Sequence, residues 1–273
     1  MTCQACGSSS IHDYVAHDEG HYLRCSGCGL VFNADAQRLM GESGEHYDDA
    51  EYFAKYRSRF PRKLRKARQQ IHLLQGYAPT GRLLDIGCGI GETLIAAREA
   101  GFEAVGLDVG EYPVQHCREL GFEVHRASIT DTGLPSDSFD VVTMWDVIEH
   151  IPRTADGLTE VARILKPGGI AVMVTPSAQY LKAHLARRVH RHFRGLWAKT
   201  HFVYHSPGSL GRVCRESGLT PLRTPVMRRG AMMQGGLSAA GELIVAPFRR
   251  VVWLVGSATR MSRNLYLIAR KDG

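Results

Sequence analysis

Short apolar runs alternate with longer amphipathic stretches through the middle of the chain. Five runs have the length of buried strands: Leu83–Ile86, Ala104–Leu107, Val124–Ala127, Phe139–Met144 and Ile170–Val174. Strands that alternate with helices in this way build a parallel sheet with helices packed on its faces. The pattern therefore predicts an α/β fold with a doubly wound, Rossmann-like sheet.

The segment before this pattern, residues 37–78, indicates a helical linker or cap. Six apolar or aromatic positions recur at steps of three and four residues, as on one face of a helix: Phe53, Tyr56, Phe60, Leu64, Ala67 and Ile71. Pro61 lies inside this pattern and lacks the N–H that a helix interior needs. Two shorter helices are therefore expected in place of one long helix.

Four cysteines near the amino terminus have the spacing of a metal site. They form two Cys-x-x-Cys pairs separated by eighteen residues: Cys3, Cys6, Cys25 and Cys28. This spacing is typical of a four-thiolate zinc site, and the glycine after each pair allows a tight turn. Two disulfides are the alternative, which a reducing cytosol disfavours. Residues 1–36 are therefore expected to form a zinc ribbon around a closed, structural Zn²⁺ site.

Basic residues gather in two stretches of a chain that has 34 Lys and Arg, 27 Asp and Glu and a formal net charge of +7. Eight basic residues and no acid lie between Lys55 and Arg68. Eleven more, with five His, lie between Tyr180 and Arg229, opposed only by Glu216. Such a distribution favours an anionic partner: a phosphate-bearing substrate, nucleic acid or acidic lipid. Solvated helix faces are the alternative.

The hydropathy of the chain argues against disorder and against a membrane span. Hydrophobic residues make up 44% and charged residues 22% of the sequence, which are values of globular proteins. No apolar run reaches the roughly 18 residues that a spanning helix needs, and the first residues lack the pattern of a signal peptide. We expect a cytoplasmic protein, with peripheral contact at a membrane surface as an open alternative.

The first predicted strand ends in a glycine-rich turn, and the second ends in an acid. The turn is Asp85-Ile-Gly87-Cys-Gly89-Ile-Gly91, and the acid is Asp108. A glycine turn after strand one and an acid at the tip of strand two are typical of nucleoside binding at the carboxyl edge of a parallel sheet. This pair of features therefore predicts a nucleoside-containing ligand.

The residues around the turn favour S-adenosylmethionine over a dinucleotide. A dinucleotide fingerprint places glycine at position 92, where helix and strand pack closely, whereas this chain has Glu92. Asp85 would repel a pyrophosphate but suits a ligand that carries an ammonium and a sulfonium group. Asp108 would then accept hydrogen bonds from both ribose hydroxyls.

Longer motifs resemble the class I S-adenosylmethionine-dependent methyltransferases. Residues 83–91 match the first motif of that family, and Asp108 matches its ribose-binding acid. Further matches are Leu134–Asp140, Met144–Ile151 and Ile164–Gly169. The similarity is strongest to the branch that contains quinone-biosynthesis and sugar methyltransferases, some of which carry an amino-terminal zinc ribbon. The resemblance implies a seven-stranded, mostly parallel sheet.

The resemblance also implies details of that sheet and of the cofactor site. The last two strands, near residues 218–227 and 264–269, would pair antiparallel. Ser128 and Ile129 would frame the adenine, and Trp145 would line the adenosine or methionine moiety unless it is a core aromatic residue. The implied contacts to S-adenosylmethionine are Asp85, Gly87, Gly89, Gly91, Asp108, Val109, Ser128, Ile129 and Trp145.

Three histidines are candidates for a general base, because the pKa of histidine lies near neutral pH. His150 follows strand four, over the expected cofactor cleft. His201 and His205 flank the segment after strand five, where the family places acceptor-pocket residues. Structural roles are the alternative for each of them, and a carbon or nitrogen acceptor can react without a base.

Residues 79–273 are expected to form the methyltransferase domain, with a lid at about 178–215 and an insertion at about 228–263. The lid contains a predicted amphipathic helix with a cationic face, Leu181–Arg194, which would grip a phosphate of the acceptor. A membrane-surface role is the alternative for this helix. The insertion contains apolar segments around Trp253. These segments would rest in a lipid headgroup layer, cover an apolar acceptor or form an extra core helix.

These features together predict a methyltransferase for a small-molecule or glycan acceptor. The acceptor is expected to be anionic, and O-methylation of a phosphate-bearing, sugar- or lipid-linked substrate fits both cationic stretches. RNA methylation is the alternative, in which the ribbon and the basic patches would bind nucleic acid. The ribbon has only Arg24 as a strong base, so nucleic acid is the less favoured partner.

Overall fold

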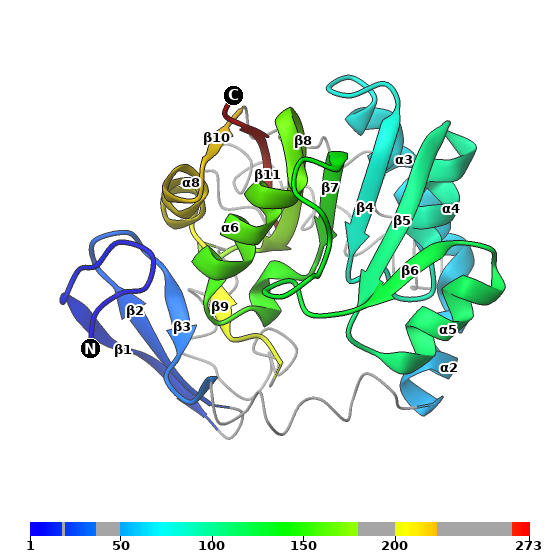
Figure 1. Ribbon diagram of the computed structural model, residues 1–273. Helices are drawn as coiled ribbons and strands as arrows, with labels where there is room; N and C mark the ends of the chain where they lie inside the picture. The colour runs from blue at the N-terminus through cyan, green and yellow to red at the C-terminus, as the bar shows by residue number, and fades with distance from the viewer. Residues whose placement is uncertain (18–19, 37–49, 180–199, 223–263) are drawn as a thin grey trace, which may run out of the picture.

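The computed structural model describes residues 1–17, 20–36, 50–179, 200–222 and 264–273. These residues form two β-sheets with helices (Figure 1). The smaller sheet has the order β1-β2-β3-β9, and the larger one has the order β10-β11-β8-β7-β4-β5-β6. The predicted lid helix Leu181–Arg194 and the insertion at 228–263 lie outside the described residues.

The larger sheet is the predicted seven-stranded, mostly parallel sheet. Its strands are β4 (Gly81–Ile86), β5 (Phe102–Asp108), β6 (Glu123–Arg126), β7 (Phe139–Trp145), β8 (Leu165–Pro176), β10 (Leu219–Pro221) and β11 (Asn264–Lys271). The four pairings among β4, β5, β6, β7 and β8 are parallel, and β11 is antiparallel to both β8 and β10. The predicted α/β fold class and the antiparallel last pair are therefore confirmed.

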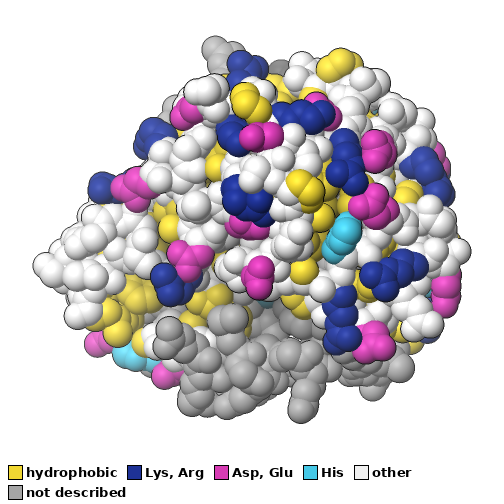
Figure 2. Space-filling view, viewed as in Figure 1, with side chains coloured by type: hydrophobic (Ala, Val, Ile, Leu, Met, Phe, Trp, Pro, Cys, Tyr) yellow, Lys and Arg dark blue, Asp and Glu magenta, His cyan; other side chains and the backbone are white. Residues whose placement is uncertain are grey.

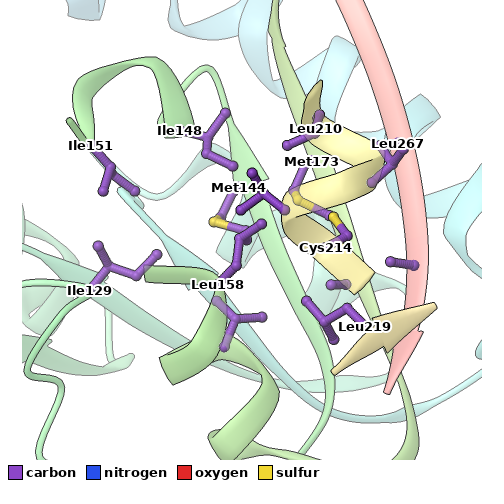
Figure 3. Packing of buried hydrophobic residues seen from close by; sticks show 14 of the residues in the cluster. Ile129, Met144, Ile148, Ile151, Leu158, Met173, Leu210, Cys214, Leu219 and Leu267 are labelled. Atoms are coloured by element: carbon purple, nitrogen blue, oxygen red, sulfur yellow. The ribbon is translucent and has the colours of Figure 1, made fainter. Parts of the chain in front are cut away.

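Helices cover both faces of this sheet, because its strands are apolar on both sides. α3 (Phe60–Leu74) and α4 (Glu92–Glu99) pack on one face, where Ala67, Ile71 and Ala97 meet Leu83 and Val141. α5 (Glu111–Glu119) packs with α4 through a smaller apolar cluster that includes Val114. α6 (Thr154–Ile164) and α8 (Pro207–Glu216) cover the opposite face, and Figure 3 shows side chains of this core.

The break in the amino-terminal helical segment lies where the sequence predicts it. α2 (Ala50–Ser58) ends before Arg59, and Pro61 lies in the first turn of α3, where its missing N–H costs nothing. Basic residues of the segment pair with acids of the larger sheet's helices and loops: Lys63 with Glu92, Lys66 with Asp146 and Arg68 with Glu99. Part of the first cationic stretch is therefore used within the molecule.

The smaller sheet contains the amino-terminal strands and one strand from much later in the chain. β1 (Ile11–His17), β2 (Gly20–Cys25) and β3 (Val31–Asn33) form an antiparallel meander, and β9 (Val203–Tyr204) pairs antiparallel with β3. The two sheets share one hydrophobic core, since Cys25, Leu30 and Phe32 belong to the same cluster as Leu210 and Val213 of α8. In Figure 1, β9 accordingly lies beside β3 and close to α6.

One face of the molecule has mixed charge (Figure 2), and the described helices are too short or too polar to cross a membrane. On the face drawn in Figure 2, Lys and Arg side chains are interspersed with Asp and Glu side chains. None of the helices in the described part of the chain has the length and apolarity that crossing a bilayer requires.

Candidate active site at the carboxyl edge of the sheet

The turn after β4 contains three backbone conformations that favour glycine. Gly87, Gly89 and Gly91 have φ of +70°, +53° and +88°, in the left-handed region that side chains rarely adopt. A Cβ atom on Gly87 would lie 2.6 Å from Cγ2 of Val147, so this turn also packs closely against the loop after β7. Gly91 is the N-cap residue of α4. The turn therefore brings backbone N–H groups to the carboxyl edge of the sheet.

Asp108, at the end of β5, fixes the shape of this turn. Its Oδ2 accepts a hydrogen bond from the Gly89 N–H at 2.9 Å, and its Oδ1 accepts one from the Gly110 N–H at 3.0 Å. Asp108 as a whole residue is 8% exposed. A carboxylate oxygen can accept more than one hydrogen bond, so these two backbone contacts do not by themselves exclude a ligand's hydroxyl groups.

Asp85, the predicted cation-facing acid, is buried beneath the turn. The Thr143 hydroxyl donates to its Oδ1 at 2.6 Å. Burial, together with the nearby carboxylates of Glu92 and Asp108, raises the pKa of Asp85 to about 8, although the hydrogen bond from Thr143 lowers it. The site thus holds three acids around one turn, and a bound cation would favour their ionised forms.

Glu92 is the first residue of α4, where a nucleotide-binding helix would meet phosphate. Its Oε1 accepts a hydrogen bond from the Tyr56 hydroxyl at 2.9 Å, and the Lys63 ammonium lies 3.3 Å away. Its buried Oε2 has no hydrogen-bond partner among the described residues. Since an acid occupies the helix N-terminus, the turn suits a cationic nucleoside better than a pyrophosphate.

A family model described as "Methyltransferase domain" matches residues 48–224, which contain this turn, both acids and the five parallel strands. The chain belongs to this family.

Curated relatives of this methyltransferase carry the name "Ubiquinone biosynthesis O-methyltransferase". The protein of Methylococcus capsulatus is 32% identical over 151 residues, which are 50% of this chain and 62% of the relative. The protein of Stutzerimonas stutzeri is 35% identical over 95 residues, which are 32% of this chain and 41% of the relative. The chain thus spans less than two thirds of the length of these relatives.

Solved structures show the same fold at low sequence identity. A SAM-dependent methyltransferase from Archaeoglobus fulgidus has a TM-score of 0.56 at 20% identity, covering 81% of this chain and all of that one. A complex of the Haloferax volcanii Trm112 methyltransferase activator with a putative methyltransferase gives a TM-score of 0.54 at 22% identity, covering 70% and 82%. Family and fold together show that residues 48–224 form a methyltransferase domain with the fold of these S-adenosylmethionine-dependent methyltransferases.

The remaining residues predicted to contact the cofactor fall into two groups. Val109 is 48% exposed beside Asp108, and Ser128 is exposed after β6, whose tip meets β5 through a hydrogen bond from the Ala127 N–H to the Asp108 carbonyl. Ile129 is buried against α6, and Trp145 packs on the α3 side of the sheet. The first pair is therefore exposed near the carboxyl edge of the sheet, whereas Ile129 is buried in one core and Trp145 is partly buried against the other.

His150 and His201 come together beside Glu149. The His150 and His201 rings lie 4.8 Å apart, edge to face, and one potential ligand atom from each of the three residues lies within 4.8 Å of the other two. Nδ1 of His150 contacts the Thr200 carbonyl at 2.7 Å, so it carries the proton and Nε2 carries the lone pair. The Glu149 carboxyl oxygens and Nδ1 of His201 are buried without a hydrogen-bond partner among the described residues.

Burial sets the protonation of this cluster. It raises the pKa of Glu149 to about 8, with a further contribution from Asp146. Burial lowers the pKa of His150, and it lowers the pKa of His201 to about 3, where the neighbouring His150 also contributes. At neutral pH both imidazoles are therefore neutral, and the Glu149 carboxyl is mostly protonated.

His205, the third predicted base, does not lie in this cluster. Its Nε2 contacts the Thr154 hydroxyl at 3.1 Å and its Nδ1 contacts the Ser209 hydroxyl at 3.2 Å, in the core between α6 and α8. Burial lowers its pKa to about 4. His205 also lines a partly open cavity of about 180 Å³ next to Ala5 and Leu30. His205 thus lies between two buried hydroxyl groups, away from His150 and His201.

The four predicted metal ligands form a single cluster. Sγ of Cys3 lies 3.6 Å from Sγ of Cys28, and Sγ of Cys6 lies 3.5 Å from Sγ of Cys25. These distances are far longer than a disulfide bond and close to the roughly 3.8 Å between thiolates that surround one tetrahedral Zn²⁺. All four ligand atoms lie within 4.8 Å of one another, which is compatible with a zinc site.

The cysteine protonation states fit a metal that displaces protons. Burial raises the pKa of Cys3 to about 11. At Cys25, hydrogen bonds from backbone N–H groups and neighbouring thiols outweigh burial and lower the pKa to about 7. A bound divalent ion would have to displace the remaining protons, because only thiolates are good zinc ligands.

Sequence patterns missed several residues that shape the site. Tyr56 and Lys63 contact Glu92 from the helical segment, and Thr143 contacts Asp85 from β7. Tyr56 and Lys63 occupy positions that only suggested a helix face. Their role depends on how α2 and α3 pack over α4, and no local sequence motif indicates this packing.

Proposed function

We propose that this methyltransferase transfers a methyl group from S-adenosylmethionine to a hydroxyl oxygen of a small-molecule acceptor. The observation that carries the proposal is the presence of two unlike sites at one edge of the sheet. One is the acid-rich glycine turn, and the other is the buried cluster of Glu149, His150 and His201. Val147 joins them, since it touches the backbone of Gly87 and directly precedes η2 (Ile148–His150).

The acid-rich turn would hold the cofactor. Asp108 would accept both ribose hydroxyls, with Val109 and Ser128 beside the adenine. Asp85 and Glu92 would complement the positive charges of the cofactor, which explains an unpaired buried oxygen on Glu92. When bound, S-adenosylmethionine supplies a methyl group that is already activated by the positive sulfur, so alignment of the acceptor is the protein's main task.

His150 would remove the acceptor's proton. Its hydrogen bond to the Thr200 carbonyl selects the tautomer in which Nε2 can accept a proton, and burial keeps this imidazole neutral at working pH. As the new C–O bond forms, the hydroxyl proton would pass to Nε2. His201 lies edge-on to the same ring and would limit its rotation.

An oxygen acceptor on a phosphate-bearing, sugar- or lipid-linked molecule fits the chain as a whole. The relatives' name, an O-methyltransferase of ubiquinone biosynthesis, supports oxygen chemistry on a small molecule. The eleven Lys and Arg between Tyr180 and Arg229 support an anionic group, because guanidinium forks match phosphate oxygens. Peripheral membrane contact would follow if the acceptor is lipid-linked.

Zn²⁺ is proposed as the ion of the four-cysteine cluster. Four thiolates leave no open coordination position, so the ion would have a structural role. Binding of the ion would displace the protons that remain on the four thiols.

Calorimetry with S-adenosylmethionine tests the cofactor assignment. Asp108→Ala removes two charge-assisted hydrogen bonds to the ribose, and we expect an affinity loss of about 100-fold. Asp156→Ala, at an exposed position of α6, is the matched control and should bind as the wild type does. Undiminished binding by Asp108→Ala would contradict the proposed cleft.

A panel of acceptors tests the proposed substrate class. Methyl-labelled cofactor would be supplied with hydroxyl acceptors in pairs that differ only in a phosphate group, and with bulk RNA. We expect transfer to a phosphorylated small molecule, with a product stable to conditions that cleave methyl esters. Transfer to RNA alone, with affinity falling steeply as salt rises, would support the nucleic-acid alternative instead.

A further inference from the structure

The segment between Thr200 and Ser206 is held from two sides. On one side, β9 pairs with β3, with Phe32 opposite Val203, and the Asn33 N–H donates to the Phe202 carbonyl at 2.8 Å. On the other side, the Phe202 N–H donates to the Glu149 carbonyl at 2.8 Å. This segment therefore lies between the smaller sheet β1-β2-β3-β9, called the cysteine sheet below, and the cluster of Glu149, His150 and His201.

Tyr22 of β2 contacts the same segment with its side chain. It is fully buried, and its hydroxyl donates to the His201 carbonyl at 3.1 Å. Its ring meets Tyr204 edge to face at 5.9 Å, and the Tyr204 ring lies 5.7 Å from that of His201. Tyr22 thus supports His201 through both its backbone and a neighbouring ring.

A third connection leads directly from a metal-ligand residue. The Ser206 hydroxyl donates to the Cys28 carbonyl at 2.6 Å and also accepts the Ser209 N–H at 3.0 Å, as the N-cap of α8. The backbone of Cys28 is therefore tied to the end of the segment that contains His201. Any change in the path of the Cys25–Cys28 turn would move Ser206.

The arrangement of His150 and His201 depends on these contacts to the segment between Thr200 and Ser206. His150 is oriented by the Thr200 carbonyl, and His201 faces His150. Neither the Thr200 carbonyl nor His201 lies in a helix or strand of the larger sheet. What fixes their positions is the hydrogen bonding to β3, Tyr22 and Glu149.

We propose that the cysteine sheet is a positioning element of methyl transfer, in which Tyr22 and β3 hold Thr200 and His201 in place against His150. Metal binding at the four cysteines would fix the path of β2 and β3 and thereby the geometry of the acceptor side, while the glycine turn stays unchanged. The inference rests on the proposed function for the role of His150. Tyr22 is a positioning residue, since it does not touch the reacting atoms.

Hydrogen–deuterium exchange tests the mechanical part without an acceptor. Exchange would be followed in the zinc-loaded full chain and after zinc removal by a chelator, both with S-adenosylmethionine present. We expect at least tenfold faster exchange in peptides covering residues 200–206 and little change in peptides covering 83–108. Unchanged exchange in residues 200–206, or an equal increase in both regions, would overturn the proposal.

Tyr22→Phe tests the role of the hydroxyl while keeping the ring and the metal. We expect a roughly 5- to 10-fold lower kcat, the effect of one lost buried hydrogen bond, with unchanged affinity for S-adenosylmethionine and unchanged zinc content. Exchange at residues 200–204 should rise in this variant as well. Tyr14→Phe, the same change on the neighbouring strand β1, is the matched control and should leave kcat within twofold.

The two failures can be told apart. If the wild type methylates no hydroxyl acceptor but zinc removal still loosens residues 200–206 selectively, the proposed function fails and the mechanical link stands. If the wild type is active and Tyr22→Phe keeps full kcat, or loses cofactor affinity in the same proportion as kcat, the positioning role of Tyr22 is wrong.

Discussion

Replacing Asp85 by asparagine should make the cofactor-free protein increasingly more stable than the wild type as pH rises, because only the wild type loses stability. Burial raises the pKa of Asp85 from 3.8 to about 8, so the folded state favours the protonated acid. The group's contribution to stability is therefore fully present below pH 4 and is lost as pH rises toward 8. Asparagine keeps an oxygen that can accept the Thr143 hydrogen bond but does not ionise, so the variant should not show this loss.

The magnitude follows from the difference between the two pKa values. Each pH unit between them costs the wild type about 1.4 kcal/mol of unfolding free energy. The advantage of Asp85→Asn over the wild type should thus grow by about 3 kcal/mol from pH 5 to pH 7. Glu149, whose pKa is also raised, contributes equally to both proteins and cancels in the comparison.

Urea unfolding of both proteins without cofactor, at pH 5, 6 and 7, provides the measurement. Asp156→Asn, at an exposed position, is the control and should follow the wild type. Binding of S-adenosylmethionine should favour the ionised form of Asp85 in the wild type, because the ligand carries positive charges. Calorimetry in buffers of different ionisation enthalpy should therefore show that the wild type releases protons at pH 7 and that the variant releases fewer. Parallel stability profiles for Asp85→Asn and wild type would refute the argument.

Three further changes have expected outcomes. Gly87→Ala places a methyl group 2.6 Å from Val147 at a φ of +70°, and its affinity for S-adenosylmethionine should fall at least tenfold by calorimetry while the far-UV spectrum stays native. The double change Cys25→Ser and Cys28→Ser should remove one equivalent of zinc by elemental analysis; full zinc content would disprove the ligand set. His205→Gln should lower the thermal midpoint by several degrees, because two buried hydroxyls lose their partner, yet keep the wild-type kcat; a loss of kcat at unchanged stability would restore a catalytic role.

Local patterns account for the parts of the structure that are local. The five central strands and the helix break near Pro61 follow from apolar runs and from the chemistry of proline, both of which act within a few residues. The glycine turn is also visible in the sequence, since a left-handed conformation at Gly87 excludes most other residues. The cysteine cluster is also visible in the sequence, because each Cys-x-x-Cys pair forms a local turn.

Positions that depend on packing were harder to predict. Trp145 is the last residue of β7, and alternation along this strand turns its side chain toward α3. His205 is only one residue from β9, yet it faces Thr154 and the core, whereas His201 faces the cluster. Tyr22 contacts a residue 179 positions away, a distance at which the sequence pattern carries no signal.

The pairing of β3 with β9 has a consequence for biosynthesis. Residues 11–33 leave the ribosome early, but their fourth strand and the Ser206 contact to Cys28, 178 positions later, exist only after most of the chain has been made. Until then the exposed edge of β3 and the apolar surface that meets α8 have no cover, which is a state prone to wrong pairing with other chains. The proposed Zn²⁺, if bound early, would keep the nascent meander closed during this time, so zinc supplied during translation should raise the yield of native protein.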